Sequence, residues 1–169
     1  MTMAMVEPVT FMEGFRPGYL GRIAQMHGEY YAGALGTGAE LEGLMARELA
    51  QFRDGYDPAR DLLLTAHVEG VLAGCVALDG GQTEHPGVRL RWFLLDAAYQ
   101  GRGIGSALLR RVLDARQAHG SGQVWLWTVE GLPQALHLYE KAGFRVVERF
   151  PDERYTVPLV NLRMEKDLP

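Results

Sequence analysis

Residues 99–109 read YQGRGIGSALL, and this stretch decides the fold. Three glycines alternate with other residues, and an apolar pattern with helical spacing begins at once. The first N–H groups of a helix have no intrahelical partner and lie at the positive end of its dipole. Because glycine has no Cβ, an anion can approach such backbone closely. Gly101, Gly103 and Gly105 therefore predict a phosphate-binding turn, with a tight turn that uses glycine only for its dihedral angles as the alternative.

Two common phosphate-binding motifs do not fit this stretch. A dinucleotide fingerprint requires G-x-G-x-x-G and an acidic residue about 20 positions later, directly after a strand. Here Ser106 stands at the third glycine position, residues 120–125 contain no acid, and DAAY separates the preceding apolar run from Gln100. A Walker A loop requires Gly-Lys-Ser/Thr, and the sequence has no Gly-Lys pair. The pattern that fits is Gln-x-x-Gly-x-Gly, formed by Gln100, Gly103 and Gly105.

Hydrophobic periodicity on both sides of the glycines predicts the remaining elements. The expected strands are 9–12, 62–68, 71–79, 88–95, 124–129, 144–150 and 159–166, and the expected helices are 18–34, 38–54, 103–119 and 132–143. Glu69-Gly70 marks a hairpin turn between two of these strands. The order β-αα-βββ-α-β-α-ββ indicates an α/β (α+β) fold, a mixed sheet with helices on its faces, in a single domain spanning 1–169.

Composition limits the class of protein. The 169 residues are 47% hydrophobic and 22% charged with a net charge of −4, which fits a soluble domain and argues against a nucleic-acid partner. No segment reaches the roughly 18 apolar residues of a membrane span, and MTMAMVEPV lacks the features of a signal peptide. The lone cysteine, Cys75, lies in an apolar run, so we expect it to pack in the core of a cytoplasmic protein. The five histidines lack metal-ligand spacing, so no metal is expected.

The Gln-x-x-Gly-x-Gly segment and the order of elements resemble the GCN5-related N-acetyltransferase (GNAT) superfamily. In that family the corresponding loop grips the pyrophosphate of acetyl-CoA. LYEKAGF (138–144) resembles the family's helix-to-strand signature after the fifth strand, and the resemblance covers about residues 9–167. The LRWFLLD, LWT and LYEKAGF stretches look closest to the acetyltransferase half of MarR–GNAT fusion proteins, although we expect no DNA-binding domain within this chain.

The resemblance implies a function and a set of cofactor contacts. The expected activity is acetyl transfer from acetyl-CoA directly to a primary amine of a small molecule or peptide, without an acetyl-enzyme. Backbone N–H groups near Leu94 and Leu95 would stabilise the oxyanion, and the same strand end would pair with pantetheine. Leu132 stands where many members carry an asparagine, and Thr128 is the expected substitute. The expected cofactor-binding residues are Leu94, Leu95, Gln100, Gly101, Arg102, Gly103, Ile104, Gly105, Ser106 and Thr128.

Tyr139 matches the family's tyrosine that protonates the departing thiolate. A phenol has a pKa of about 10 and a thiol one of about 8.5, so the tyrosine stays a proton donor at neutral pH. The alternative is an aromatic side chain that only packs its helix against the sheet. The amine must be neutral to react, but the position where some protein-lysine acetyltransferases carry a glutamate holds Arg89. This difference argues against a glutamate base and against a lysine side chain as acceptor. Other candidates, acting directly or through water, are His27, Glu29, Glu84 and His85.

Three residues are candidates for contact with the acceptor. Arg89 and Arg91 would share a face of a regular strand and could meet a carboxylate of the acceptor, although solvation or ion pairing is the favoured expectation. Tyr31, next to Tyr30, lies on the first helix, which in this family helps to wall the acceptor site. A non-catalytic acyl-CoA sensor and a dimerisation domain without cofactor remain as alternatives. A homodimer is expected only by analogy, and neither a nucleic acid nor a membrane is expected as a partner.

Overall fold

The computed structural model describes residues 8–120 and 122–169, so the expectation about a signal peptide lies mostly outside the described residues. Within them the predicted order of elements is confirmed. The elements are β1 (Val9–Glu13), α1 (Tyr19–Leu35), α2 (Ala39–Asp54), β2 (Leu62–Val68), β3 (Val71–Asp79), β4 (Val88–Leu95), the short 3₁₀ helix η1 (Ala97–Tyr99), α3 (Ile104–Ala118), β5 (Gly122–Val129), α4 (Pro133–Lys141), β6 (Arg145–Asp152) and β7 (Leu159–Leu168).

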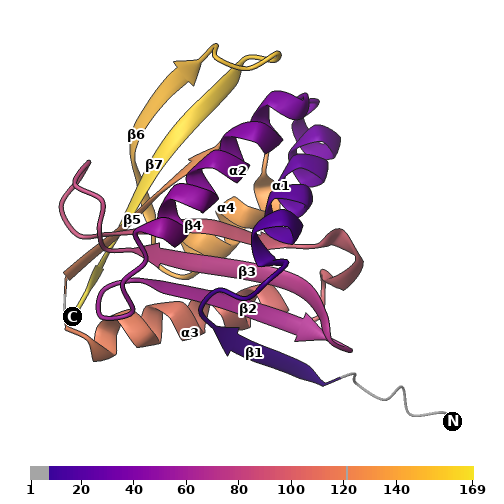
Figure 1. Ribbon diagram of the computed structural model, residues 1–169. Coiled ribbons are helices and arrows are strands. Elements are labelled where there is room, and N and C mark those ends of the chain that lie inside the picture. Colours follow the sequence, from indigo (N-terminus) through magenta and orange to yellow (C-terminus); the bar gives the residue numbers. More distant parts are fainter. Residues whose placement is uncertain (1–7, 121) are drawn as a thin grey trace, which may run out of the picture.

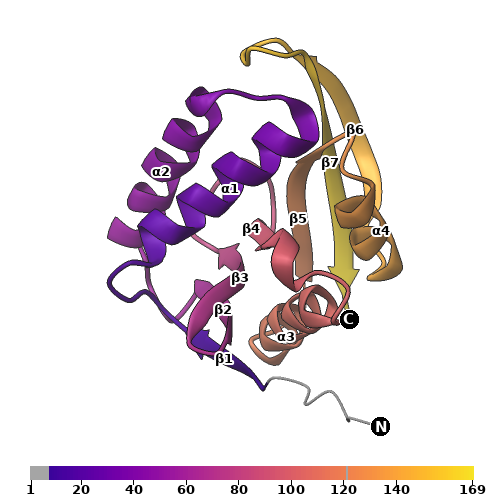
Figure 2. The same ribbon diagram turned by 90° about the vertical axis from the view of Figure 1, so that its right-hand side faces the viewer.

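The described strands form one sheet in the order β1-β2-β3-β4-β5-β7-β6. All neighbouring pairs are antiparallel except β4 and β5, which are parallel. Helices α1 and α2 cover one face, and α3 and α4 cover the other (Figures 1 and 2). The core therefore consists of two apolar layers, one on each side of the sheet. The mixed-sheet prediction is confirmed.

Local sequence signals explain several boundaries. Glu69 and Gly70 have φ angles of 51° and 79°, which gives the two-residue hairpin turn the left-handed backbone that suits strand twist. Pro133 stands in the first turn of α4, where its missing N–H costs no hydrogen bond. Helix α4 ends earlier than predicted, at Lys141, because Gly143 adopts a φ of 95° and its N–H bonds to the carbonyl of Glu140.

Strand β4 has two irregularities that shape the space beside it. Only Val88 and Arg89 pair with β5, opposite Val124 and Trp125, and the two strands diverge beyond this point. Further along, a bulge at Trp92, with a φ of 48°, shifts the register against β3. A left-handed conformation costs a non-glycine residue about 1–2 kcal/mol, so the surrounding packing must hold it. Because β4 and β5 pair at one end and then diverge, the rest of this edge of β4 has no strand partner in the described part of the sheet.

The bulge changes which face each β4 side chain meets. Arg91 contacts α2, and Trp92 packs on Phe52 of the same helix with ring centroids 5.1 Å apart. Phe93 instead faces the opposite layer, 5.6 Å from the ring of Tyr139. A regular strand would have placed Arg91 and Trp92 on opposite faces. The irregularity thus turns one aromatic ring into the core and the next toward α4.

Cys75 is fully buried, and its predicted packing role is confirmed. Its Sγ–H donates to the carbonyl of Trp92 over 3.1 Å, beside the bulge. Burial raises the pKa of this thiol to about 12, so it stays neutral and is a poor nucleophile. No helix in residues 8–120 or 122–169 is long and apolar enough to cross a membrane.

Candidate functional site

A cleft of about 760 Å³ lies where β4 and β5 diverge. Helices α1 and α2, the loop 80–87, the outer part of β4, the start of α3, β5, α4 and the β6–β7 hairpin all contribute to its walls. The sheet itself therefore creates the space, because β4 stops pairing with β5 after two residues. One end of the cleft reaches the glycine segment, and the other reaches the α1–α2 helices and the hairpin.

The glycine segment forms the first end of the cleft. Gly101 and Gly103 have φ angles of 76° and 77°, which favour glycine, and Gly103 is the N-cap of α3 without a side-chain cap. A Cβ placed on either residue would meet no heavy atom of the described chain within 4 Å. Gly105 and Ser106 also line the cleft. The arrangement leaves the amide end of α3 accessible to an anion, as the sequence predicts.

Gln100, directly before the glycines, ties them to β4. Its Nε2 donates to the carbonyl of Leu95 over 3.3 Å. Asp96 accepts a hydrogen bond from the N–H of Ala98 and forms a 2.6 Å ion pair with Arg22 of α1. The Ala98 amide and the Arg22 guanidinium hold the pKa of Asp96 below its usual range despite partial desolvation. Sequence reasoning missed Arg22 and Asp96, because nothing local shows that α1 packs against this turn.

The structure brings most of the predicted cofactor residues together. Arg102 and Ile104 are the exceptions: the Arg102 guanidinium lies over Tyr99 at 5.6 Å, and the Ile104 side chain is buried in the core. Ile104 can therefore offer a ligand only its backbone. The predicted residues that line the cleft are Leu94, Leu95, Gln100, Gly101, Gly103, Gly105, Ser106 and Thr128.

Tyr139 lies on the wall of the same cleft. Its ring is 5% exposed and packs against Phe93 and Phe144, at centroid distances of 5.6 and 5.8 Å. Its hydroxyl has no hydrogen-bond partner among the described residues. Burial, with smaller contributions from Tyr31 and Tyr30, raises the pKa of Tyr139 well above its ordinary value. The phenol is therefore fully protonated at neutral pH and is available to a ligand.

Aromatic side chains of α1 line the second end of the cleft. His27 and Tyr31 stack with centroids 6.3 Å apart, and Tyr30 meets Tyr31 edge-on at 5.7 Å. The Nδ1–H of His27 donates to the carbonyl of Ile23 over 2.8 Å, which leaves Nε2 without a proton in the neutral ring. Burial lowers the pKa of His27 to about 4 and raises that of Tyr31 to about 12. Both side chains are uncharged at neutral pH.

The other candidate bases differ in position. Glu84 lines the cleft and accepts a hydrogen bond from the indole Nε1–H of Trp127 over 3.1 Å. His85 packs edge-on against Trp125 and does not line the cleft. Glu29 is also outside the lining and accepts a hydrogen bond from Gln25 on the surface of α1. Of the four candidates, the structure places only His27 and Glu84 on the cleft wall.

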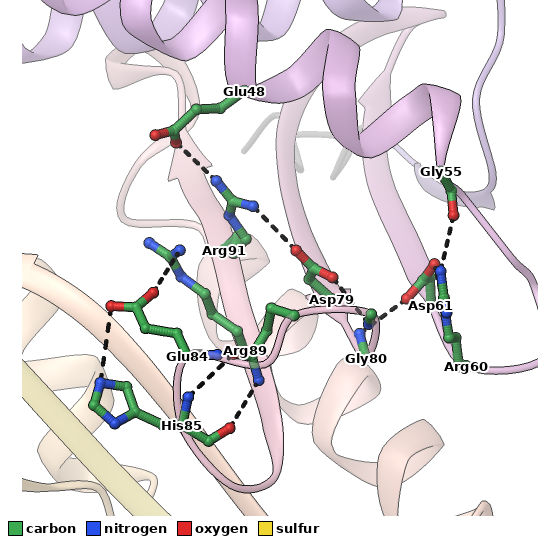
Figure 3. Close-up of polar contacts among 12 residues, drawn as sticks. Glu48, Gly55, Arg60, Asp61, Asp79, Gly80, Glu84, His85, Arg89 and Arg91 are labelled. Carbon is green, nitrogen blue, oxygen red and sulfur yellow. Dashed lines mark hydrogen bonds and ion pairs between the residues drawn. The ribbon is translucent and has the colours of Figure 1, made fainter.

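Arg91 and Arg89 both line the cleft, yet their partners differ (Figure 3). Arg91 pairs with Glu48 at 2.7 Å and with Asp79 at 3.0 Å, and its side chain is only 13% exposed. The predicted ion pairing is thus confirmed for Arg91, which joins α2 to β3. Among the residues that the structure describes, Arg89 forms an ion pair only with Glu84, at 3.6 Å.

The guanidinium of Arg89 is held less completely than that of Arg91. It lies over the ring of Trp125 at 5.2 Å, and its Nε is buried without a hydrogen-bond partner among the described residues. Burial and the neighbouring charge of Arg91 lower the pKa of Arg89, while Glu84 opposes this. A guanidinium stays charged in proteins, so the lowered pKa marks an under-compensated cation.

The β6–β7 hairpin closes the second end of the cleft. Glu40, at the start of α2, accepts hydrogen bonds from the N–H of Thr156 at 3.2 Å and from its hydroxyl. The Thr156 hydroxyl, with the backbone amides of this contact, lowers the pKa of Glu40 to about 2. Near the hairpin tip, Asp152 accepts hydrogen bonds from the Nε of Arg154 at 2.9 and 3.0 Å. Sequence reasoning missed the contact of Glu40 with Thr156, which joins residues far apart in the chain.

Comparisons with known proteins agree on the kind of fold. A sequence profile of the Acetyltransferase (GNAT) family matches residues 23–144. N-acetylaspartate synthetase of Rattus norvegicus is 29% identical over 131 residues, which cover 77% of this chain and 43% of the relative. Mycothiol acetyltransferase of Corynebacterium glutamicum is 44% identical over 54 residues, 32% of this chain and 18% of the relative. The chain thus spans less than half the length of these curated relatives.

A solved structure supports the fold over nearly the whole chain. The yncA protein of Salmonella typhimurium, solved with its cofactor acetyl-CoA, superposes with a TM-score of 0.69 at 17% sequence identity. The match covers 96% of this chain and 95% of the other. At this identity the likeness establishes the fold.

Proposed function

Since the chain belongs to the acetyltransferase (GNAT) family, we propose that it is an acetyl-CoA-dependent N-acetyltransferase acting on a primary amine of a small molecule or peptide. The observation that carries the proposal is the divergence of β4 and β5, which opens a cleft running from the uncapped start of α3 to Tyr139. The cleft thus offers an anion-binding end, an unpaired strand edge and a buried proton donor.

The residues present fit acetyl-CoA. Its diphosphate needs N–H donors with free space beside them, and Gly101 and Gly103 leave such space at the start of α3. Its pantetheine amides need a strand edge, and β4 beyond Arg89 offers one up to Leu95. When bound, acetyl-CoA supplies an activated acetyl thioester. A backbone N–H of Leu94 or Leu95, which line the cleft, would then stabilise negative charge on the carbonyl oxygen, and such a donor is worth about 3–4 kcal/mol.

Proton transfers complete the proposed chemistry. A C–N bond forms as the C–S bond breaks, and the ammonium ion of the acceptor loses two protons in total. One proton leaves before attack, because only the neutral amine is a nucleophile. Tyr139 would deliver a proton to the departing sulfur, and the second proton of the acceptor nitrogen would pass, directly or through water, to the Tyr139 oxygen and restore the phenol. Burial keeps this phenol protonated across the neutral range. His27 Nε2 and Glu84 are the cleft groups that can accept a proton, directly or through water.

The test is release of the coenzyme thiol with a panel of amines. Aspartate belongs in the panel, because the name of one matched relative indicates aspartate acetylation. We expect thiol release with at least one amine, and mass spectrometry should find the acetyl group on its nitrogen. Tight binding of acetyl-CoA without release for any amine would favour a sensor instead. At about 100 times its Kd, a ligand stabilises the protein by about 2.7 kcal/mol, so a thermal-shift scan detects binding independently.

Other expectations from sequence stay predictions. They are the special likeness to MarR-fused acetyltransferases, a cytoplasmic location, a single domain over residues 1–169, a homodimer, and the absence of nucleic-acid and membrane partners. No group of three or more metal-ligating side chains is gathered anywhere in residues 8–120 and 122–169, and the expectation that the enzyme needs no metal stays a prediction as well.

A further inference from the structure

Three arginines line the cleft, and they are neutralised to different degrees. Arg91 has carboxylates at 2.7 and 3.0 Å, and Arg154 donates to both oxygens of Asp152. Arg89 has only the 3.6 Å ion pair with Glu84, and its guanidinium donates no hydrogen bond to any described residue. An arginine carries five N–H donors, so a mostly buried one without a hydrogen bond is an unfilled site for an anion.

Arg89 lies in the same cleft as Tyr139, the proposed acid. Arg89 is the last β4 residue that pairs with β5, so its side chain stands at the vertex where the strands diverge. Arg89, Phe93 and Tyr139 all line the cleft, and the rings of Phe93 and Tyr139 lie 5.6 Å apart. A group bound at Arg89 therefore shares the cavity with the proposed acid.

Glu84 shows which chemistry this site recognises. Its carboxylate accepts a hydrogen bond from Trp127 Nε1 and lies within ion-pair distance of Arg89 and of His85 Nε2. The donors thus come from two strands and a loop and converge on one carboxylate. Glu84 itself belongs to the loop between β3 and β4, and its side chain is 48% exposed while that of Arg89 is 21% exposed. A carboxylate on a half-exposed side chain is easier to displace than the two carboxylates that hold Arg91.

We propose that the acceptor is an amine that also carries a carboxylate, and that Arg89 and Trp127 Nε1 bind this carboxylate in place of Glu84. The inference rests on the proposed acetyltransferase function and adds the substrate class to it. The amine is then anchored through its carboxylate at the vertex of the cleft, with its nitrogen free to point along β4. The planar guanidinium of an arginine can bind both oxygens of a carboxylate, which the ammonium group of a lysine matches less well.

Matched acceptors test this inference. L-alanine and L-alaninamide have nearly the same shape and differ in the negative charge, and L-aspartate with its diamide forms a second pair. The quantity to compare is the ratio of kcat/KM for the acid to kcat/KM for the amide in each enzyme. Because the amide's amine has a lower pKa than the acid's, the ratio is compared between variants rather than read from one enzyme. We expect Arg89→Gln to lower this ratio about 10- to 150-fold, the range for a lost charged hydrogen bond.

Three further variants sharpen the experiment. Arg89→Lys keeps the charge without the planar fork, so it should recover only part of the ratio. Glu84→Gln removes the competing carboxylate and should raise the ratio. Arg149→Gln removes a guanidinium on β6 that pairs with Glu130 outside the cleft lining, so it should leave the ratio unchanged. The amide rates report whether the arginine variants are folded and active, and urea unfolding reports folding of Glu84→Gln, because Glu84 is also a candidate proton acceptor.

Several outcomes would overturn the inference. An unchanged ratio in Arg89→Gln would show that Arg89 does not bind the carboxylate of the acceptor. A wild-type preference for polyamines that Glu84→Gln abolishes would point to a cationic acceptor instead. If no amine were acetylated, the proposed function would fail on its own. The site would then still be tested by calorimetry with N-acetyl-L-alanine and its amide in the presence of coenzyme A. Arg89-dependent binding of the acid alone would support the site, and equal binding of both would reject it.

Discussion

Replacing Tyr139 by phenylalanine removes one oxygen atom and tests the proposed acid most directly. The ring would keep its contacts with Phe93 and Phe144, because those contacts do not involve the hydroxyl. The hydroxyl has no hydrogen-bond partner among the described residues, so no buried donor or acceptor is left unpaired by its loss. We therefore expect the free energy of unfolding to change by less than about 0.5 kcal/mol.

The expected loss of activity is much larger than the change in stability. A positioned general acid contributes about 10²- to 10⁴-fold to a rate, which corresponds to about 3–5 kcal/mol of activation free energy. The raised pKa of Tyr139 adds a second expectation, since the phenol should not ionise below about pH 10. In the wild type, kcat should show no alkaline decline from this residue in the range where the enzyme is stable.

The assay is steady-state thiol release with the best amine of the panel, alongside urea unfolding of both proteins. Retention of kcat within threefold in Tyr139→Phe, with unchanged unfolding, would refute the acid role. The tyrosine would then be an aromatic that packs α4 against the sheet.

Three other variants test the structure around the cleft. Arg91→Met should lower the free energy of unfolding by about 3–5 kcal/mol, or about 6–20 °C in Tm, because it leaves two partly buried carboxylates unpaired; a loss below about 1 kcal/mol would contradict this. The pKa of His27 is about 4 in the folded protein and about 6.5 in the unfolded chain, so acid favours the unfolded state. The wild-type free energy of unfolding should therefore fall by about 2 kcal/mol between pH 7 and pH 5 through this residue. In urea titrations at the two pH values, His27→Gln should not show this fall. In Gly103→Ala the alanine must adopt a φ of 77°, which costs about 1–2 kcal/mol, so the variant should bind acetyl-CoA more weakly in a thermal-shift titration. The control Gly33→Ala, in the interior of α1, should stabilise the protein and bind acetyl-CoA normally.

The sequence predicted the elements well where the signals are local. The hairpin at Glu69-Gly70, the helix start after Gly103 and the proline at Pro133 are all encoded within a few residues of the feature that they create. The cofactor end of the cleft was predictable for the same reason, since its glycines are neighbours in the chain. Motif spacing then identified the family to which the chain belongs.

The acceptor end was not predictable in detail, because long-range packing creates it. Glu48 comes from α2, and nothing in its surroundings in the sequence indicates that it neutralises Arg91. The influence of Tyr31 on the pKa of Tyr139 likewise depends on long-range packing, which brings α1 and α4 to the same cleft. The bulge at Trp92 has no glycine or proline to announce it, although it decides which way Phe93 points.

The scarcity of pairing between β4 and β5 has a mechanical consequence. Across this seam the sheet is joined by only two opposed residue pairs, while the far end is bridged by the contact of Glu40 with Thr156. Any bending of the sheet should therefore occur at Val88 and Arg89, so that strands β1–β4 move relative to strands β5–β7. The separation of the two strands would then depend on a hydrogen bond at the surface of the molecule, between the start of α2 and the β6–β7 hairpin.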